Sequence, residues 1–209
     1  AGLSLVGALP HRTAAGEARD SVGFDAAGQL DGKLDALVLL NVEPDADLAG
    51  DDATGKFSQH GFVIALTPFD APSLREGADL MLPIGTFAET SGTYVNVAGT
   101  AQRFNGIATP VGEARPAWKV LRVLGNLVEA PDFEYVTSED VYAEIHEILE
   151  SASPEDRYDS SRVVSKPNGA DAPSEEIDVP LYSVDSAVRR ARALQLTPEA
   201  RRARGEADE

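Results

Sequence analysis

Hydroxyl and carboxylate side chains gather at one corner of the chain, in the segment ETSGTYVN at 89–96. A hydroxyl at such a corner can attack a substrate, bind a phosphate or fix the bend of the backbone. The nucleophile elbow G-x-S-x-G is absent, because no glycine stands two residues before Ser91. We therefore interpret Thr90 and Ser91 as residues that hydrogen-bond the backbone of a tight corner. Glu89 is expected to orient the turn or pair with a cation, not to act as a general acid.

Cysteine and histidine offer little further chemistry. The chain contains no cysteine, which excludes disulfides, thiolate nucleophiles and a cysteine-held iron–sulfur cluster within it. His11, His60 and His146 are too scattered along the sequence to form a metal-binding pattern. We predict no catalytic, cofactor-binding or metal-binding residue in this chain.

Three apolar runs predict the strands that position the corner. They are ALVLLNV at 36–42, GFVIALTPFD at 61–70 and ADLMLPIG at 78–85. Apolar side chains on both faces of a strand indicate burial on both faces, as in a parallel sheet. Polar segments separate the runs, so the pattern predicts an open, mostly parallel α/β sheet.

The chain after the corner predicts a β-hairpin and then two amphipathic helices. Residues 93–97 and 100–104 are the hairpin strands, and the helices are expected within 116–130 and 137–150. Residues 1–150 are thus predicted to form one partial α/β domain. Residues 151–209 are predicted to be an extended linker followed by an arginine-rich arm.

The arm contains six arginines between Arg189 and Arg204. It is either a solvated helix face or an arm that binds an acidic neighbour. In the second case, neutralising Arg189, Arg190 and Arg192 weakens association with partner subunits, most strongly at low salt. Four apolar residues are expected to form its docking stripe: Leu181, Val184, Val188 and Leu194.

Ligands of open α/β sheets bind outside the carboxyl ends of the strands. The first of these ends carries Glu43, Asp45 and Asp47, which would repel a phosphate group. Neither G-x-G-x-x-G after a strand nor a P-loop motif is present. The sequence therefore disfavours a nucleotide-like ligand at this edge.

Overall composition limits the class of protein further. The 209 residues have a net charge of −17, which makes nucleic-acid binding unfavourable. No apolar run is long enough to span a bilayer. The chain begins with alanine and shows no signal-peptide pattern, so we expect it to be part of a longer polypeptide.

The segment ADLMLPIGTFAETSGTYVNVAGTAQRFNGIATPVGEARPAWKVLRVLGNL resembles the molybdopterin oxidoreductase superfamily. Within it, GALPHR, LLNVEPD and VPLYSVDSAVRRARALQLTPEA resemble the large iron–sulfur subunit of bacterial NADH:quinone oxidoreductase, respiratory complex I. The resemblance covers most of the chain and is weakest in 13–32 and 150–178.

This resemblance implies a framework role. Subunits of that family hold their 2Fe-2S and 4Fe-4S clusters through cysteines nearer the N-terminus, so this cysteine-free chain corresponds to the C-terminal portion. It implies support for electron transfer from NADH to quinone, with other peripheral-arm subunits as partners. The location implied is the cytoplasmic face of the bacterial inner membrane, without insertion into it.

Two departures from the superfamily pattern bear on cofactor binding. Molybdenum enzymes have a small-residue G-x-N-P where this chain has Asn41-Val42-Glu43-Pro44, and a glutamate beside a pyrophosphate is unfavourable. Ala98-Gly99-Thr100 replaces the usual Glu-Gly-Arg. We therefore expect no pterin dinucleotide here. Two alternatives stay open: a fragment of a catalytic molybdopterin enzyme similar to formate dehydrogenase, and a general Rossmann-type nucleotide-binding module.

Overall fold

The computed structural model contains a three-stranded parallel sheet in the order β1-β2-β3. Leu39 of β1 stands beside Ala65 of β2, which in turn stands beside Met81 of β3. The predicted α/β class and the three predicted strands are confirmed. The strand bounds are β1 (Leu37–Leu40), β2 (Val63–Thr67) and β3 (Leu80–Pro83). The structure describes residues 2–14, 16–48, 52–96, 98–151, 181–203 and 205–206, so the predicted linker at 152–180 lies outside the described residues.

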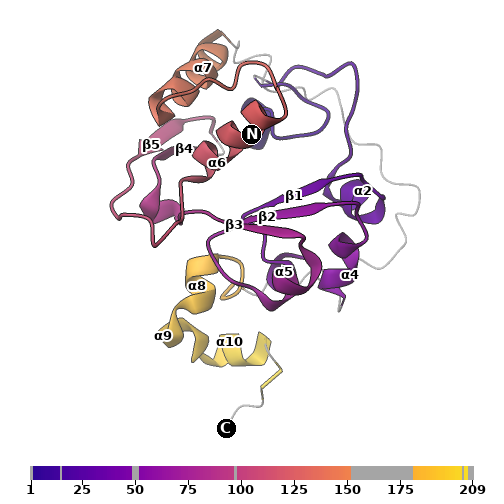
Figure 1. Cartoon of the computed structure of the whole chain (residues 1–209). Coiled ribbons are helices and arrows are strands. Elements are labelled where there is room, and N and C mark those ends of the chain that lie inside the picture. Colours follow the sequence, from indigo (N-terminus) through magenta and orange to yellow (C-terminus); the bar gives the residue numbers. More distant parts are fainter. Residues whose placement is uncertain are drawn as a thin grey trace, which may run out of the picture.

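Short helices connect the strands and cover one face of the sheet, as Figure 1 shows for α4 and α5. Proline begins both α3 and α5, where its missing N–H costs nothing. Asp52 caps α4 by accepting a hydrogen bond from Gly55 N at 2.7 Å. The helix bounds in this part are α1 (Gly2–Leu5), α2 (Ala26–Asp31), α3 (Pro44–Asp47), α4 (Ala53–Ser58) and α5 (Pro72–Gly77).

The core lies between this face of the sheet and helices α4 and α5. Phe57, Val63 and Leu74 are fully buried there. His60 is also buried, and its Nδ1 accepts a hydrogen bond from Leu34 N at 3.1 Å. This histidine therefore connects the end of α4 to the segment before β1.

The opposite face of the sheet differs from the prediction. Leu37 and Leu39 are buried, but Val38 and Leu40 are 46% and 45% exposed. The prediction that β1 is buried on both faces is therefore wrong for the described chain. The reason is that α4 and α5 both pack on the face of the sheet that carries the side chains of Leu37 and Leu39.

The hairpin and the two helices that follow it are confirmed. Asn96 Oδ1 forms the hairpin turn by accepting hydrogen bonds from Ala98 N and Thr100 N. Arg103 links the hairpin to the second helix through Glu139 at 3.1 Å and the ring of Tyr142. The bounds are β4 (Gly92–Val95), β5 (Ala101–Phe104), α6 (Ala117–Leu127) and α7 (Ser138–Ser151).

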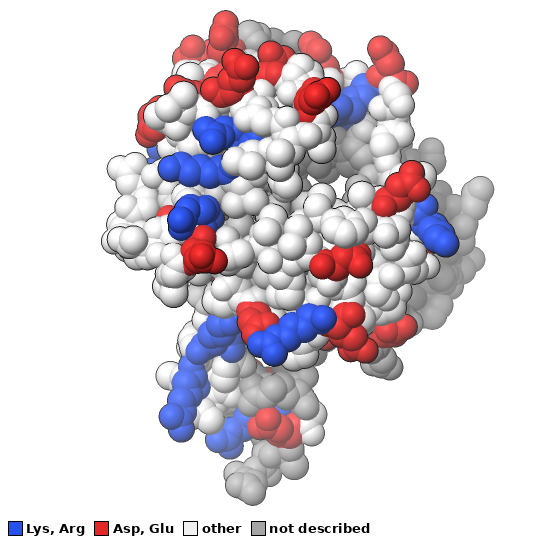
Figure 2. Space-filling model, viewed as in Figure 1, with Lys and Arg blue, Asp and Glu red and all other residues white. Residues whose placement is uncertain are grey.

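The arginine-rich arm leaves the body below β3 and ends away from it (Figure 1). Its helices are α8 (Ser186–Arg190), α9 (Arg192–Gln195) and α10 (Pro198–Ala203). The predicted docking stripe is not buried in this chain, because Leu181, Val184 and Leu194 are exposed. Figure 2 shows basic side chains along the arm and acidic ones at the far end of the molecule, where α7 lies. Within the described residues, no helix is long and apolar enough to cross a membrane.

Candidate functional site at the carboxyl edge of the sheet

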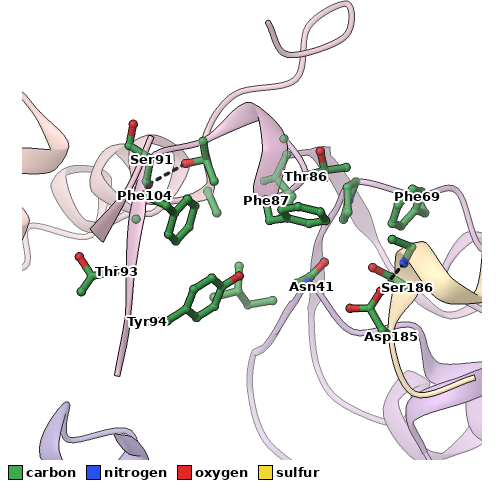
Figure 3. Close-up of a pocket in the computed structure, with 18 residues that line it drawn as sticks. Asn41, Phe69, Thr86, Phe87, Ser91, Thr93, Tyr94, Phe104, Asp185 and Ser186 are labelled. Carbon is green, nitrogen blue, oxygen red and sulfur yellow. Dashed lines mark hydrogen bonds between the residues drawn. The ribbon is translucent and has the colours of Figure 1, made fainter. Parts of the chain in front are cut away.

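A cavity of about 730 Å³ lies at the carboxyl edge of the sheet. Its walls come from the ends of all three strands, from the hairpin and from the start of α8. Figure 3 shows Tyr94 and Phe104 on one side and Asp185 and Ser186 of the arm on the other, with Asn41 between them. Ligands of open α/β sheets bind at the carboxyl ends of the strands, and the structure places a cavity there.

The hairpin side of the cavity is aromatic. The rings of Tyr94 and Phe104 stack with centroids 4.9 Å apart and an interplanar angle of 16°. Gly92 permits this stack, because a Cβ at that position would lie 2.8 Å from the Phe104 ring. Gly92 of ETSGTYVN is thus required for the close packing of the Phe104 ring against the backbone of β4.

Glu89 organises the corner between β3 and the hairpin. Its Oε2 accepts hydrogen bonds from Thr86 N at 2.8 Å and from Thr86 Oγ1 at 2.9 Å. Its Oε1 accepts from Val111 N at 3.2 Å. These hydrogen bonds lower the pKa of the Glu89 carboxyl, with the two from Thr86 the largest causes. Glu89 was expected either to orient the turn or to pair with a cation. Its hydrogen bonds to Thr86 and Val111 show that it orients the turn.

The hydroxyl groups of the corner also contact backbone groups. Thr90 Oγ1 donates to the carbonyl of Ser91 at 3.1 Å, and Ser91 Oγ accepts from Gly106 N at 3.4 Å. No described histidine is hydrogen-bonded to Ser91. This arrangement supports the interpretation of ETSGTYVN as a structural corner.

Acidification is expected to loosen this corner. The folded-state pKa of Glu89 is below its ordinary value of 4.5, so its hydrogen bonds stabilise the fold above that value. That contribution is lost as the pH falls through the depressed folded pKa. We expect the amide exchange of Thr86 and Val111, corrected for its intrinsic pH dependence, to accelerate as the pH falls below the ordinary Glu89 value of 4.5 and through its lowered folded pKa. NMR measures it, and Glu89→Gln should abolish the transition; an unchanged transition in that variant would contradict the assignment.

Carboxylates surround the carboxyl end of β1, the segment of Glu43, Asp45 and Asp47 that we call the mouth of β1. Asp47 Oδ2 accepts a hydrogen bond from Glu43 N at 2.7 Å, and Asp45 Oδ2 accepts one from Ser73 Oγ at 2.6 Å. Glu43 itself points to the arm, where Arg190 binds both of its carboxylate oxygens, at 3.0 and 2.6 Å. Bidentate guanidinium–carboxylate pairs are the strongest common ion pairs in proteins.

The second arginine completes the cluster. Arg189 Nη1 lies 3.2 Å from Glu43 Oε1, and Arg189 Nη2 bonds Asp47 Oδ1. The side chains of Arg189 and Glu43 are each only 13% exposed. Both guanidinium groups thus bind carboxylates of their own chain. The weakening of partner association on neutralising Arg189, Arg190 and Arg192 stays a prediction.

A pterin dinucleotide does not fit the mouth of β1 as these residues fill it. Its pyrophosphate would lie against the carboxylate of Glu43 and would compete with Glu43 and Asp47 for the two arginines. No group of three or more metal-binding side chains occurs among the residues that the structure describes. We therefore derive no chemical step through such a cofactor.

Sequence reasoning missed the residues that close this edge. Of the two interpretations of the arm, a solvated helix face and an arm that binds an acidic neighbour, neither identified Glu43 as the partner of Arg189 and Arg190. Phe69 was missed as well, although the Arg190 guanidinium lies 3.5 Å from its ring centroid. The only available signal was opposite charge in two distant segments, which does not specify a pairing.

The parallel sheet and its connections define an open α/β protein with a cavity at the carboxyl ends of the strands. The molybdopterin oxidoreductase family model matches residues 10–127, which is more than half of the chain, and the chain belongs to that family.

Several curated proteins are similar to the chain. It is 34% identical over 116 residues to the G subunit of the NADH-quinone oxidoreductase of Shewanella oneidensis, which covers 51% of the chain and 12% of that protein. It is 30% identical over 124 residues to the mitochondrial NADH-ubiquinone oxidoreductase 78 kDa subunit of Candida albicans, and the match covers 58% of the chain and 16% of that protein. It is 29% identical over 119 residues to a nitrate reductase of Symbiobacterium thermophilum, and the match covers 56% of the chain and 15% of that protein. The matched part thus spans less than a fifth of these relatives.

Proposed function

We propose that the chain is the C-terminal, non-cluster-binding framework portion of the large iron–sulfur subunit of an NADH:quinone oxidoreductase. In this role it supports the cluster-bearing part of the subunit during electron transfer from NADH to quinone. Its partners are the other peripheral-arm subunits, at the cytoplasmic face of the bacterial inner membrane. It inserts no segment into the bilayer and binds no nucleic acid.

The observation that carries this proposal is the closure of the mouth of β1 by Glu43, Asp47 and the two arginines. At this edge the carboxylate of Glu43 would repel a pyrophosphate, and Arg189 and Arg190 already pair with Glu43 and Asp47. A catalytic molybdenum enzyme would instead need this edge to bind the pyrophosphate of its cofactor. The similarity to the Shewanella and Candida subunits supports the same assignment.

The exposed face of the sheet also supports a framework role. Val38, Leu40 and Leu80 are 46%, 45% and 39% exposed, and Val38 and Leu80 both neighbour Ile64. Burying apolar surface stabilises by about 25 cal/mol per Å², so this face favours contact with another apolar surface. A fragment that supports the rest of a large subunit would offer such a face.

A second candidate is a fragment of a catalytic molybdopterin-dependent oxidoreductase, favoured by the similarity to a nitrate reductase. It requires glycine-rich pterin loops and a metal ligand elsewhere in the polypeptide.

Purification of the complete polypeptide from its host tests the proposal. We expect the tagged polypeptide to co-purify with flavin- and cluster-containing subunits and with NADH:quinone oxidoreductase activity. Recovery of an enzyme that reduces nitrate or oxidises formate, without NADH:quinone activity, would favour the second candidate. Saturable binding of a nucleotide to the chain in calorimetric titration would instead support a nucleotide-binding module.

A further inference from the structure

The two arginines of α8 reach a site that three separate segments of the chain build. Glu43 precedes α3, Asp47 ends it, and Phe69 follows β2. Glu43 and Asp47 supply negative charge, and Phe69 supplies a flat ring. This combination suits a guanidinium group, which is planar, always charged and able to stack on an aromatic face.

Each arginine uses the site differently. Arg190 forms the bidentate pair with Glu43 and lies with its guanidinium carbon 3.5 Å from the Phe69 ring centroid. Arg189 bridges Glu43 and Asp47. A lysine has a single ammonium group and cannot reproduce either arrangement.

The arm is folded so that both arginines point at this site. Asp185 caps α8 by accepting hydrogen bonds from Ala187 N at 2.8 Å and Val188 N at 3.1 Å. Arg189 also donates to the carbonyl of Ser183. Gln195 Nε2 donates to the carbonyls of Tyr182 and Val188, at 2.8 and 2.9 Å. These bonds within the arm fix the positions from which Arg189 and Arg190 reach the site.

We propose that Glu43, Asp47 and Phe69 form an arginine-binding site and that the C-terminal arm of the same chain is its occupant. The bound arm places Asp185, Ser186 and Ala187 in the wall of the cavity at the carboxyl edge of the sheet. The docked arm therefore both fills the mouth of β1 and completes the cavity beside it. This inference rests on the contacts of the arm and not on the proposed function.

Amide hydrogen exchange of residues 181–195, measured by mass spectrometry on the full chain, tests the inference. Glu43→Gln keeps the shape of the side chain and removes its charge, and Arg190→Gln removes the bidentate donor. Arg190→Gln is expected to accelerate exchange in α8 about tenfold, the usual scale for losing one charged hydrogen-bonded pair. Glu43→Gln should accelerate it at least as much, because it also removes the contact of Glu43 with Arg189. Because the Arg190–Glu43 pair is already lost in Glu43→Gln, adding Arg190→Gln should accelerate exchange less than Arg190→Gln does in the unaltered chain.

Two controls use neighbouring side chains of the same type. Arg192→Gln changes an exposed arginine of the arm, and Asp45→Asn changes a carboxylate of α3 that accepts a hydrogen bond from Ser73 instead of binding the arm. Neither should alter exchange in α8. Exchange in β2 should stay slow in every variant, which shows that the core is intact; if Glu43→Gln disturbs β2, the Arg190→Gln variant decides alone.

Unchanged exchange of α8 in Arg190→Gln, or an equal effect of Arg192→Gln, would overturn the inference. The measurement is repeated at two protein concentrations. Protection that is independent of concentration is expected for an arm bound within its own chain. Protection that rises with concentration would show that the arm docks on a second copy, and would overturn the assignment of the occupant.

Discussion

Replacing Phe57 with alanine is expected to destabilise the chain by about 3–5 kcal/mol. Phe57 is fully buried at the centre of the core, against helix α5 and the sheet. Alanine would lose the transfer free energy of the ring and leave a cavity that the rigid surroundings fill only in part. Because whole domains are stable by only about 5–15 kcal/mol, this one change removes a large part of the total.

Urea unfolding followed by far-ultraviolet circular dichroism measures the Phe57 effect. Phe24→Ala is the matched control, because Phe24 is 62% exposed and its removal leaves no buried cavity. We expect the midpoint of Phe57→Ala to fall far below that of Phe24→Ala. Similar midpoints for the two variants would show that the core is not centred on Phe57.

Replacing Gly77 with alanine is expected to destabilise the chain by about 1–2 kcal/mol, against the usual helix preference. Alanine in a helix normally stabilises by about 0.5–1 kcal/mol relative to glycine. Here the new Cβ would lie 2.6 and 2.8 Å from two atoms of the Phe57 ring and 3.0 Å from Thr54 Cγ2. Overpacking of this kind costs about 1–3 kcal/mol, so the clash outweighs the helix preference.

A double-variant cycle identifies the clash as the cause. Phe57→Leu shortens the side chain that the new methyl group meets, so Gly77→Ala should cost less in that background than in the unaltered chain. Gly28→Ala is the control, because its Cβ would meet only the exposed Phe24 and Asp25, at 3.2 and 3.3 Å. Additive effects of the Gly77 and Phe57 changes would exclude a direct contact.

The strands and the edge where a ligand would lie were predictable, because they follow from local patterns. Runs of apolar residues mark the positions of the three strands, and parallel strands place their carboxyl ends together. The role of Glu89 was predictable only in outline. Its position beside a turn indicates an orienting residue, but its acceptance of a hydrogen bond from Val111 N depends on how the loop after the hairpin returns.

The closure of the mouth of β1 was not predictable from the sequence. Arg190 and Glu43 are 147 positions apart, and no periodicity connects them. Composition indicates only that a basic arm in an acidic chain will find carboxylates, and the chain offers many. The exposure of Val38 and Leu40 was missed for a similar reason, because an apolar strand does not reveal whether its own chain covers both faces.

The division into a domain at 1–150 and an arm at 151–209 stays a prediction. So does the absence of catalytic, cofactor-binding and metal-binding residues. The contacts of Glu43 bear most directly on the second point, because they place a paired carboxylate where a dinucleotide would need hydrogen-bond donors.

The molybdenum and pterin content of the complete polypeptide, purified from its host, is the most direct test of the framework account. Metal analysis and the fluorescence of oxidised pterin measure the two components. The account predicts far less than one of either per polypeptide, with Arg190 still bound to Glu43 in a crystal structure of the same material. One pterin dinucleotide per polypeptide, with its pyrophosphate at Glu43 and the arm displaced, would contradict it.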